Sequence, residues 1–205
     1  MCVAGLLLAG CGGGGDDETS TSALPAGCTS VTPPKPKQVQ LSRPEARLHG
    51  PTTAVVQTSC GSFDIALDVN RAPATAASFA YQARQGVYDG TIFHRIIPGF
   101  VVQGGDPTGT GSGGPGYFVD ETPPQDLSYT RGVVAMAKTQ AEPPGRSGSQ
   151  FFVITAADAG LTPDYALLGR VTAGLDVVQR IESLGTASGA PRAPVVISRI
   201  TITPG

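Results

Sequence analysis

Residues 93–116, FHRIIPGFVVQGGDPTGTGSGGPG, contain side chains whose types and spacing could do chemistry. A guanidinium at Arg95 and an amide at Gln103 flank an apolar run that includes Phe100. Alternate side chains of a strand share one face, although the Pro-Gly break within this stretch resets the register. One fixed cation, an apolar wall and an amide are together suited to binding a peptide without cutting it.

Other chemistries fit this stretch poorly. Gly109, Gly111 and Gly114 have the spacing of a dinucleotide-binding fingerprint, but a Pro-Pro pair follows where that fingerprint requires a helix. A hydrolytic nucleophile needs a base within reach. His49 lies in a proline-rich segment, and we expect His94 to be a hydrogen-bonded structural residue on a strand. Because no set of His, Cys and carboxylate side chains converges, we expect no metal and no cofactor.

Short strands are the elements that must position these residues. The chain has 28 glycines and 18 prolines in 205 residues, which favours tight turns and short strands. Alternating apolar residues over 54–69 predict a hairpin with its turn at Cys60 and Gly61. Helical periodicity over 71–86 and 174–183 predicts two helices. Since strands and helices do not alternate as βαβ units, the pattern favours a mainly β domain with an antiparallel sheet closed into a barrel.

The charge balance excludes several partners. The formal net charge is −2, with 14 basic and 16 acidic residues in mixed order. No basic face is therefore available for nucleic acid or for an anionic lipid surface. The length predicts one domain, over residues 51–205, preceded by a tail.

The N-terminus has the features of a targeting segment. Residues 1–11, MCVAGLLLAGC, are apolar and too short to span a bilayer. The run from Leu8 to Cys11 resembles the lipobox of bacterial lipoproteins, in which the signal is cut before a cysteine that then carries lipid. No Lys or Arg precedes the apolar run, which indicates a start codon further upstream, and a chance cysteine is the alternative. Residues 12–50, rich in Gly, Ser and Pro, are predicted to be a flexible tether.

These features predict an extracytoplasmic protein that is attached to a bacterial cell membrane only through a lipid on Cys11. If Cys2 leaves with the signal and Cys11 is acylated, Cys28 and Cys60 remain as a pair. Outside the cytoplasm such a pair often forms a disulfide, which would join the tail to the domain. Two free thiols are the alternative.

Residues 93–116 and 132–155 together resemble the cyclophilins, the barrel-type peptidyl-prolyl cis/trans isomerases. The second stretch reads GVVAMAKTQAEPPGRSGSQFFVIT, with GSQFF at its centre, and the similarity extends over residues 54–203. The resemblance implies a closed eight-stranded antiparallel barrel capped by two helices, with the active site on its outside. It implies a monomeric isomerase that acts on X-Pro bonds of peptides and unfolded exported proteins and assists their folding. A proline-peptide-binding chaperone or scaffold with little catalysis is the alternative on the same fold.

The resemblance also implies roles for individual residues. Arg95 would be the catalytic arginine. The side chains that would surround the proline ring or hold the substrate are Phe100, Val101, Gln103, Met136, Ala137, Lys138, Gln150, Phe152, Leu161 and Tyr165. Val101 stands where Met is common in the family, and Lys138 where Asn is usual. Gly160 stands where many members have a Trp that contacts cyclosporin, so we expect weak inhibition by that compound.

Overall fold

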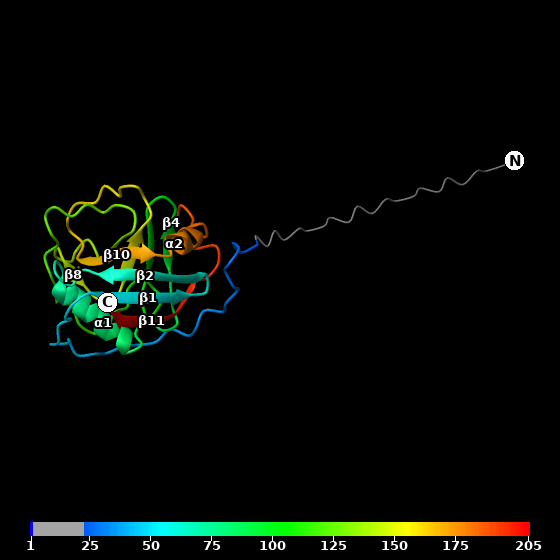
Figure 1. The fold of residues 1–205 in the computed structure, drawn as a ribbon. Coiled ribbons are helices and arrows are strands. Elements are labelled where there is room, and N and C mark those ends of the chain that lie inside the picture. The colour runs from blue at the N-terminus through cyan, green and yellow to red at the C-terminus, as the bar shows by residue number, and fades with distance from the viewer. Residues whose placement is uncertain (2–22) are drawn as a thin grey trace.

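The computed structural model describes residue 1 and residues 23–205 (Figure 1). Two antiparallel sheets and two helices form the domain. In chain order the elements are β1 (Thr52–Thr58), β2 (Gly61–Leu67), α1 (Pro73–Arg84), β3 (Thr91–Ile92), β4 (Arg95–Ile97), β5 (Val101–Gly104), β6 (Val119–Asp120), β7 (Val133–Met136), β8 (Arg146–Ser147), β9 (Phe151–Ile154), β10 (Leu167–Ala173), α2 (Leu175–Glu182) and β11 (Val196–Pro204). Cys11 and the first part of the expected tether, residues 12–22, lie outside the described residues.

The larger sheet has nine strands in the order β3-β11-β1-β2-β10-β7-β9-β5-β4, and β6 pairs with β8 in the smaller sheet. The edge strands β3 and β4 follow each other in the chain, with only Phe93 and His94 between them. The sheet therefore curls round until its two edges meet through the chain itself. Eight strands in a closed ladder were expected from the resemblance. The structure instead has nine strands, because the segment TIFHRII forms two short strands, β3 and β4, which pair with β11 and β5. These two edge strands are consecutive parts of one segment and do not pair with each other, so the sheet is not closed by hydrogen bonds between its edges.

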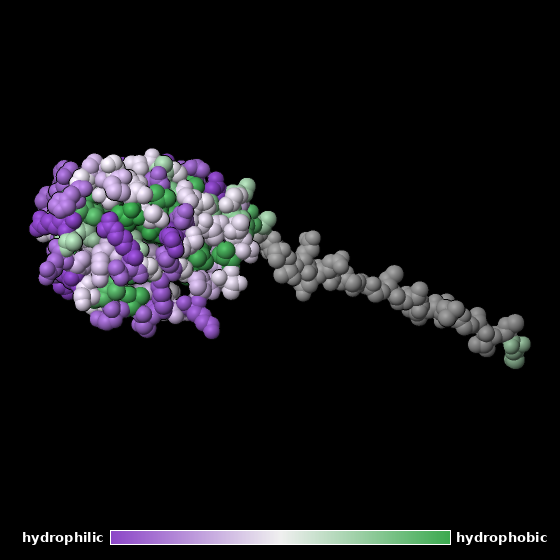
Figure 2. Space-filling view, turned by 60° about the horizontal axis from the view of Figure 1, so that its bottom comes forward, coloured by the Kyte–Doolittle hydropathy of each residue, from purple (hydrophilic) through white to green (hydrophobic). Residues whose placement is uncertain are grey.

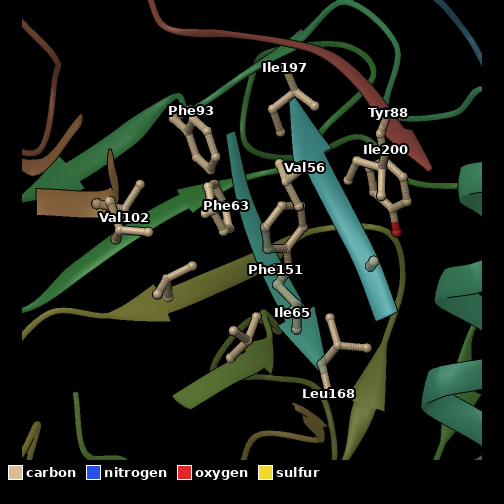
Figure 3. Packing of buried hydrophobic residues seen from close by; sticks show 14 of the residues in the cluster. Val56, Phe63, Ile65, Tyr88, Phe93, Val102, Phe151, Leu168, Ile197 and Ile200 are labelled. Carbon is tan, nitrogen blue, oxygen red and sulfur yellow. The ribbon is translucent and has the colours of Figure 1, made fainter. Parts of the chain in front are cut away.

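Side chains from most of these strands fill the interior of the barrel (Figure 3). The ring of Phe151 lies at the centre of an aromatic cluster. The rings of Phe79, Tyr88 and Phe93 meet it nearly edge-on, with centroids 5.5, 5.9 and 6.1 Å away. Edge-to-face packing at these distances stabilises a core beyond the burial of area alone. Since the four rings come from α1, β9 and the connections around β3, the cluster fixes α1 against the sheet.

Both helices form where the sequence predicts them, each shorter by one or two residues at either end. Pro73 occupies the first turn of α1, where its missing N–H costs no hydrogen bond. The backbone N–H groups of Ala74 and Thr75 donate to the carboxylate of Glu121 at 3.0 and 2.7 Å. An acidic side chain from a distant loop thus satisfies the free donors at the start of the helix. In α2 Asp176 lies in the first turn and Arg180 in the last.

Residues 23–50 contain no helix or strand, but they lie against the barrel. The backbone N–H of Thr29 donates to Ser59 O at 2.8 Å, and the N–H of Leu41 donates to Pro115 O at 2.8 Å. Lys37 Nζ donates to Gly86 O at 2.7 Å. The described part of the segment that was expected to be a tether therefore has specific partners on the domain.

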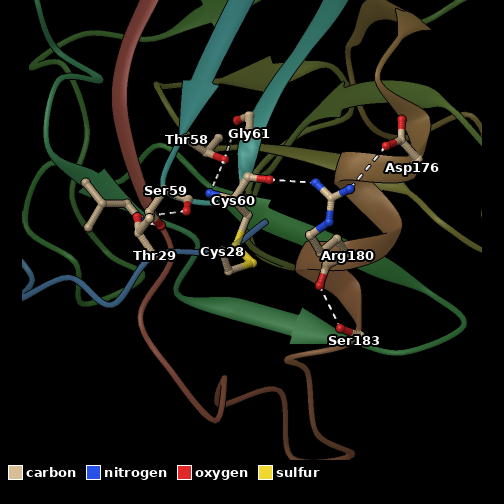
Figure 4. Close-up of a disulfide and its surroundings, with 10 residues drawn as sticks. Cys28, Thr29, Thr58, Ser59, Cys60, Gly61, Asp176, Arg180 and Ser183 are labelled. Carbon is tan, nitrogen blue, oxygen red and sulfur yellow. Dashed lines mark hydrogen bonds and ion pairs between the residues drawn. A yellow bond between two sulfur atoms is a disulfide. The ribbon is translucent and has the colours of Figure 1, made fainter. Parts of the chain in front are cut away.

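A disulfide joins Cys28 to Cys60, the pair for which cysteine counting predicts a bond (Figure 4). Cys60 occupies the turn between β1 and β2, and it is buried. Its carbonyl oxygen accepts a hydrogen bond from Arg180 Nη1 at 2.8 Å, and Arg180 Nη2 lies 3.3 Å from Asp176 Oδ2. The bond thus ties the tail to the hairpin at a point that α2 also holds.

The surface shows no dominant apolar area on the face drawn in Figure 2, where small hydrophobic patches lie between polar residues. Within the described residues, no helix combines the length and the apolar character needed to cross a membrane.

Removing the disulfide is expected to destabilise the domain. The bond closes a loop with a sequence separation of 32 residues. On chain-entropy grounds such a cross-link contributes about 3–4 kcal/mol by restricting the unfolded chain. Urea unfolding of the Cys28→Ser/Cys60→Ser double variant under oxidising conditions should show this loss of unfolding free energy. An unchanged free energy would contradict the expectation, and a Thr32→Ser variant controls for changes in the tail.

Candidate active site

The register of the sheet assembles a row of side chains on the outer face of the barrel. Arg95 on β4 pairs with Gln103 on β5, and Gln103 pairs with Phe152 on β9. Phe152 in turn pairs with Ala135 on β7. Directly opposite residues of antiparallel strands point to the same side. Four strands therefore place a cation, an amide, an aromatic ring and a small residue side by side.

The neighbouring row points the other way. Met136, Phe151 and Gly104 are paired across β7, β9 and β5. Met136 is 1% exposed and packs in the interior of the barrel, whereas Ala135 and Ala137 belong to the outer cluster. Side chains alternate between faces along a strand, so Met136 cannot share the face of its two neighbours. The expectation that Met136 helps to wall the proline pocket is corrected accordingly.

A hollow of about 220 Å³ opens on the outer face. Its lining comprises Arg95, Phe100, Val101, Gln103, Ala137, Lys138, Phe152, Leu161 and Tyr165. These are the residues that the resemblance implies, apart from Met136 and Gln150. Gln150 lines an adjoining hollow instead. A larger hollow of about 660 Å³ elsewhere on the domain has no aromatic side chain in its lining, so it offers no comparable wall for an apolar ring.

A chain of side-chain hydrogen bonds orients the guanidinium. Arg95 Nη1 donates to Gln103 Oε1 at 3.2 Å, and Gln103 Nε2 donates to Gln150 Oε1 at 3.2 Å. Gln150 Nε2 donates to the carbonyl oxygens of Gly111 and Gly113 at 3.0 and 3.1 Å. Each amide accepts from one neighbour and donates to the next, so the position of Arg95 depends on the glycine-rich loop. The carbon stem of Arg95 also passes Gly189, where a Cβ would lie 3.3 Å from Arg95 Cγ.

Asp106 holds that glycine-rich loop. Its carboxylate is fully buried and accepts from the backbone N–H groups of Thr108, Gly111 and Gly113 at 2.7, 2.6 and 3.1 Å. Burial alone would raise the pKa of Asp106, but the hydrogen bonds from Gly113, Thr108 and Gly111 outweigh it and lower the pKa. A Cβ at Gly113 would lie 2.0 Å from Asp106 Oδ1, so only glycine fits there. Sequence reasoning missed Asp106, although an Asp before Pro and a run of glycines signals a side-chain-stabilised turn.

Aromatic rings form the opposite wall of the hollow. The rings of Phe152 and Tyr165 meet at 88° with centroids 5.4 Å apart. Tyr129 Oη donates to Tyr165 O at 2.6 Å and accepts from Tyr165 N at 3.0 Å. Burial raises the pKa of Tyr129 to about 12, so it remains a donor at neutral pH. Tyr129 positions Tyr165, and it was missed because its loop has no periodicity that would place it beside the site.

Lys138 lines the hollow, but its charge is already paired. Lys138 Nζ lies 2.7 Å from Asp164 Oδ2, and its side chain is only 5% exposed. The same ammonium group lies 5.4 Å from the ring centroid of Tyr165 and donates to Glu142 O at 3.1 Å. Lys138 therefore packs against the ring of Tyr165 in the wall, and its ammonium group is paired with Asp164 and is not a free cation for a substrate.

His94 lies beside the network and lines neither hollow. Burial lowers the pKa of His94, while the negative charge of Asp106 opposes this effect. Its place outside both hollows agrees with a structural role, but His94 lies in the break between β3 and β4 rather than on a strand, and its buried Nδ1 has no hydrogen-bond partner within the described residues. Among the described residues, no group of three or more His, Cys, Asp or Glu side chains could hold a metal ion.

The geometry provides a cation beside an aromatic pocket on the outer face of a curled sheet. A family model described as "Cyclophilin type peptidyl-prolyl cis-trans isomerase/CLD" matches residues 53–202. The chain belongs to the cyclophilin family of peptidyl-prolyl cis-trans isomerases. As an enzyme of this family, it catalyses the cis/trans interconversion of peptide bonds that precede proline.

Curated relatives and solved structures agree with this assignment. The enzyme is 41% identical over 141 residues to "Peptidyl-prolyl cis-trans isomerase-like 1" of Gibberella zeae, covering 67% of this chain and 85% of the relative. It is 41% identical over 147 residues to "Peptidyl-prolyl cis-trans isomerase ppi1" of Schizosaccharomyces pombe, covering 69% and 93%. A crystal structure of a Cryptosporidium parvum cyclophilin-type isomerase, determined in the presence of the dipeptide Ala-Pro, is similar with a TM-score of 0.69 and 31% identity. That match covers 75% of this chain and 99% of the other.

Replacing Asp106 with Asn should weaken the loop that orients Arg95. The variant should lose about 1–3 kcal/mol of unfolding free energy, because an amide accepts fewer hydrogen bonds than the buried carboxylate. The folded-state pKa of Asp106 is lowered, so the contribution of the carboxylate is complete above about pH 4 and is lost as the pH falls through the folded-state value. Urea unfolding of both proteins from pH 7 to pH 2.5 measures this difference. A gap that stays constant at low pH, or an equal loss in the exposed-acid control Asp126→Asn, would contradict the role of Asp106.

Proposed function

We propose that catalysis takes place at the outer hollow, with Arg95 as the catalytic residue, and that the natural substrates are X-Pro bonds in unfolded exported proteins. The enzyme would assist their folding as a monomer attached to a bacterial cell membrane through a lipid on Cys11. The position of Arg95 beside the aromatic pocket is the observation that carries the catalytic part of the proposal.

The chemistry requires no covalent intermediate and no proton transfer. An X-Pro bond resists rotation because the nitrogen lone pair is conjugated with the carbonyl group, which gives a barrier of about 18–20 kcal/mol. Uncatalysed exchange takes tens of seconds or longer. An enzyme accelerates it by binding the twisted amide better than either planar isomer. In the twisted state the prolyl nitrogen becomes pyramidal and can accept a hydrogen bond.

Arg95 suits this task because its guanidinium is cationic throughout the physiological pH range and its donors form a rigid fork. Arg95 Nη1 donates to Gln103 Oε1 at 3.2 Å, and Arg95 Cζ lies 5.8 Å from the ring centroid of Phe100. With the proline ring against the aromatic wall, the guanidinium is in place to donate to the prolyl nitrogen. A 10⁵-fold acceleration corresponds to about 7 kcal/mol. One charged hydrogen bond contributes about 1.5–3 kcal/mol, so fixing the proline ring and the substrate backbone must contribute the rest.

The Cryptosporidium parvum relative supports the substrate class, since its structure was determined in the presence of Ala-Pro. Ala137, whose backbone N–H donates to Gln150 O at 2.8 Å, lines both this hollow and the one that adjoins it. Together with Gln103 it would hold the substrate backbone.

Substitution of Arg95 tests the catalytic role. We expect Arg95→Ala to lower kcat/KM on an Ala-Pro tetrapeptide by about 10²–10³-fold, the usual loss when a charged donor to the transition state is removed. Arg95→Lys should recover only a small part, because an ammonium group cannot form the Gln103 contact and reach the nitrogen together. NMR exchange measurements report the rate directly. Arg199→Ala, at an exposed strand position, is the matched control.

Equal rates for the wild type and Arg95→Ala would contradict the catalytic role of Arg95. Titration with the same peptide shows whether Arg95→Ala still binds it, so that a lower rate can be assigned to lost catalysis and not to lost binding.

The run from Leu8 to Cys11 supports attachment through a lipid, and the Cys28–Cys60 disulfide fits an oxidising compartment. Labelling with a radioactive fatty acid in the native host should give a labelled protein for the wild type and none for Cys11→Ser. Cys2→Ser serves as the control, because Cys2 would leave with the signal. Label that persists in Cys11→Ser would contradict this attachment site.

A further inference from the structure

A second hollow, of about 450 Å³, adjoins the one that holds Arg95. The two hollows share Gln103, Ala137 and Lys138 in their linings. The second is bounded mainly by the glycine-rich loop and by the segment around Thr139 and Glu142. A peptide whose proline occupies the first hollow therefore passes the second within a few residues.

Part of the wall of this second hollow comes from outside the barrel. Gln38 and Val39 contribute to its lining. We name residues 36–41, which contain these two residues, the wall segment. They precede the first strand of the barrel by more than ten positions, and composition alone marks them as part of a tether. Their presence beside a substrate groove is a property of this chain that the barrel sequence does not require.

The wall segment is held in place on both sides of Val39. The backbone N–H of Lys37 donates to Pro107 O at 2.9 Å, and Lys37 Nζ donates to the carbonyl oxygens of Gly86 and Asp89 at 2.7 and 2.8 Å. The N–H of Leu41 donates to Pro115 O at 2.8 Å. These bonds join the segment to both ends of the glycine-rich loop, so it has a fixed place next to the groove.

The domain surface is also shaped to receive the residues before the wall segment. Gly90 has a φ of 78°, and a Cβ there would lie 2.9 Å from Cγ of Pro34. A proline ring cannot move aside as a flexible side chain can. The docked path of residues 34–41 thus depends on the absence of a side chain at Gly90.

The second hollow has a negative charge balance. Lys138 is paired with Asp164 at 2.7 Å, while Glu142, whose Oε2 accepts from the backbone N–H of Thr139, makes no ion pair within the part of the chain that the structure describes. With Lys138 offset by Asp164, Glu142 carries the remaining charge in the lining, and Arg146 nearby reduces its field in part. A basic side chain of a substrate is favoured there over an acidic one.

We propose that the wall segment determines substrate specificity: a side chain close to the proline enters the second hollow and packs against Gln38 and Val39, with basic and neutral residues preferred over acidic ones. This inference rests on the proposed function, because it takes the first hollow as the place of the proline ring. The substrate class is an extended peptide with a single proline and a large neutral or basic residue nearby.

Selectivity ratios of the full chain test this inference. Each peptide contains one proline. The two residues before the proline and the two residues after it are replaced one at a time by Gly, Leu, Lys or Glu. NMR exchange gives kcat/KM for each peptide without a coupled protease. Val39→Trp, which fills the hollow, should lower the Leu-to-Gly ratio by about ten-fold at one of these positions, a usual effect of pocket size on discrimination. Thr32→Trp, an exposed tail position outside both linings, should leave the ratio unchanged.

Charge is tested separately. Glu142→Gln should lower the Lys-to-Glu ratio by about two- to five-fold at the same position, since partly exposed charge pairs have modest effects. The Asp126→Asn variant, which removes an exposed carboxylate outside both linings, should leave that ratio unchanged.

The outcomes separate this inference from the proposed function. If Arg95→Ala loses activity while Val39→Trp and Thr32→Trp give identical ratios at every position, the inference is overturned and the catalytic role of Arg95 stands. A uniform loss on all peptides in Val39→Trp would also overturn it, because the wall segment would then support the fold of the site without selecting substrates. If Arg95→Ala keeps its activity, the proposed catalytic role of Arg95 is contradicted, and with it the placement of the proline on which this inference rests.

Discussion

The chain of hydrogen bonds from Asp106 to Arg95 is the interaction on which the site depends. The isomerised bond undergoes no covalent chemistry, so the enzyme can act only through the placement of groups that favour the twisted amide. An exposed arginine has about 2 kcal/mol of rotamer entropy to lose when it adopts one orientation. Gln103 and Gln150 restrict Arg95 before substrate arrives, and the loop held by Asp106 restricts Gln150. A buried carboxylate that lies outside the linings of both hollows thus sets the direction of the guanidinium.

Burial on both faces makes β7 and β9 suitable to carry the site. Every residue of these two strands is buried, because one face packs in the barrel and the other under the outer cluster. Phe151 and Phe152 are neighbours in the chain, yet the first lies at the centre of the interior aromatic cluster and the second in the aromatic wall of the outer hollow. Close packing of the interior therefore limits the movement of the outer wall.

The sequence was informative where the physical signal is local. Alternation and helix signals place the hairpin and both helices, and cysteine counting selects the bonded pair. The residues of the site came from the resemblance, because the pairing of Gln103 with Phe152 spans 49 positions and no local pattern reveals it. Alternation along β7 would have predicted that Met136 points to the face of the sheet opposite to that of Ala135 and Ala137. Asp106 and Tyr129 act through loops whose conformation depends on partners far along the chain, and the docking of residues 23–50 depends on carbonyl groups such as those of Pro107 and Pro115.

The order of features along the tail has a mechanical consequence. Cys28 precedes the wall segment, and its disulfide is supported by Arg180 at Cys60 O and by Thr29 at Ser59 O. The proposed membrane attachment would exert a force on the N-terminus. The disulfide would transmit this force to the β1–β2 turn before it reaches Lys37. The wall segment is held only by hydrogen bonds and packing, which a pull would otherwise break first. The disulfide would thus isolate the groove from the proposed attachment, so that one stretch of chain could serve both as a connection and as part of the proposed binding surface.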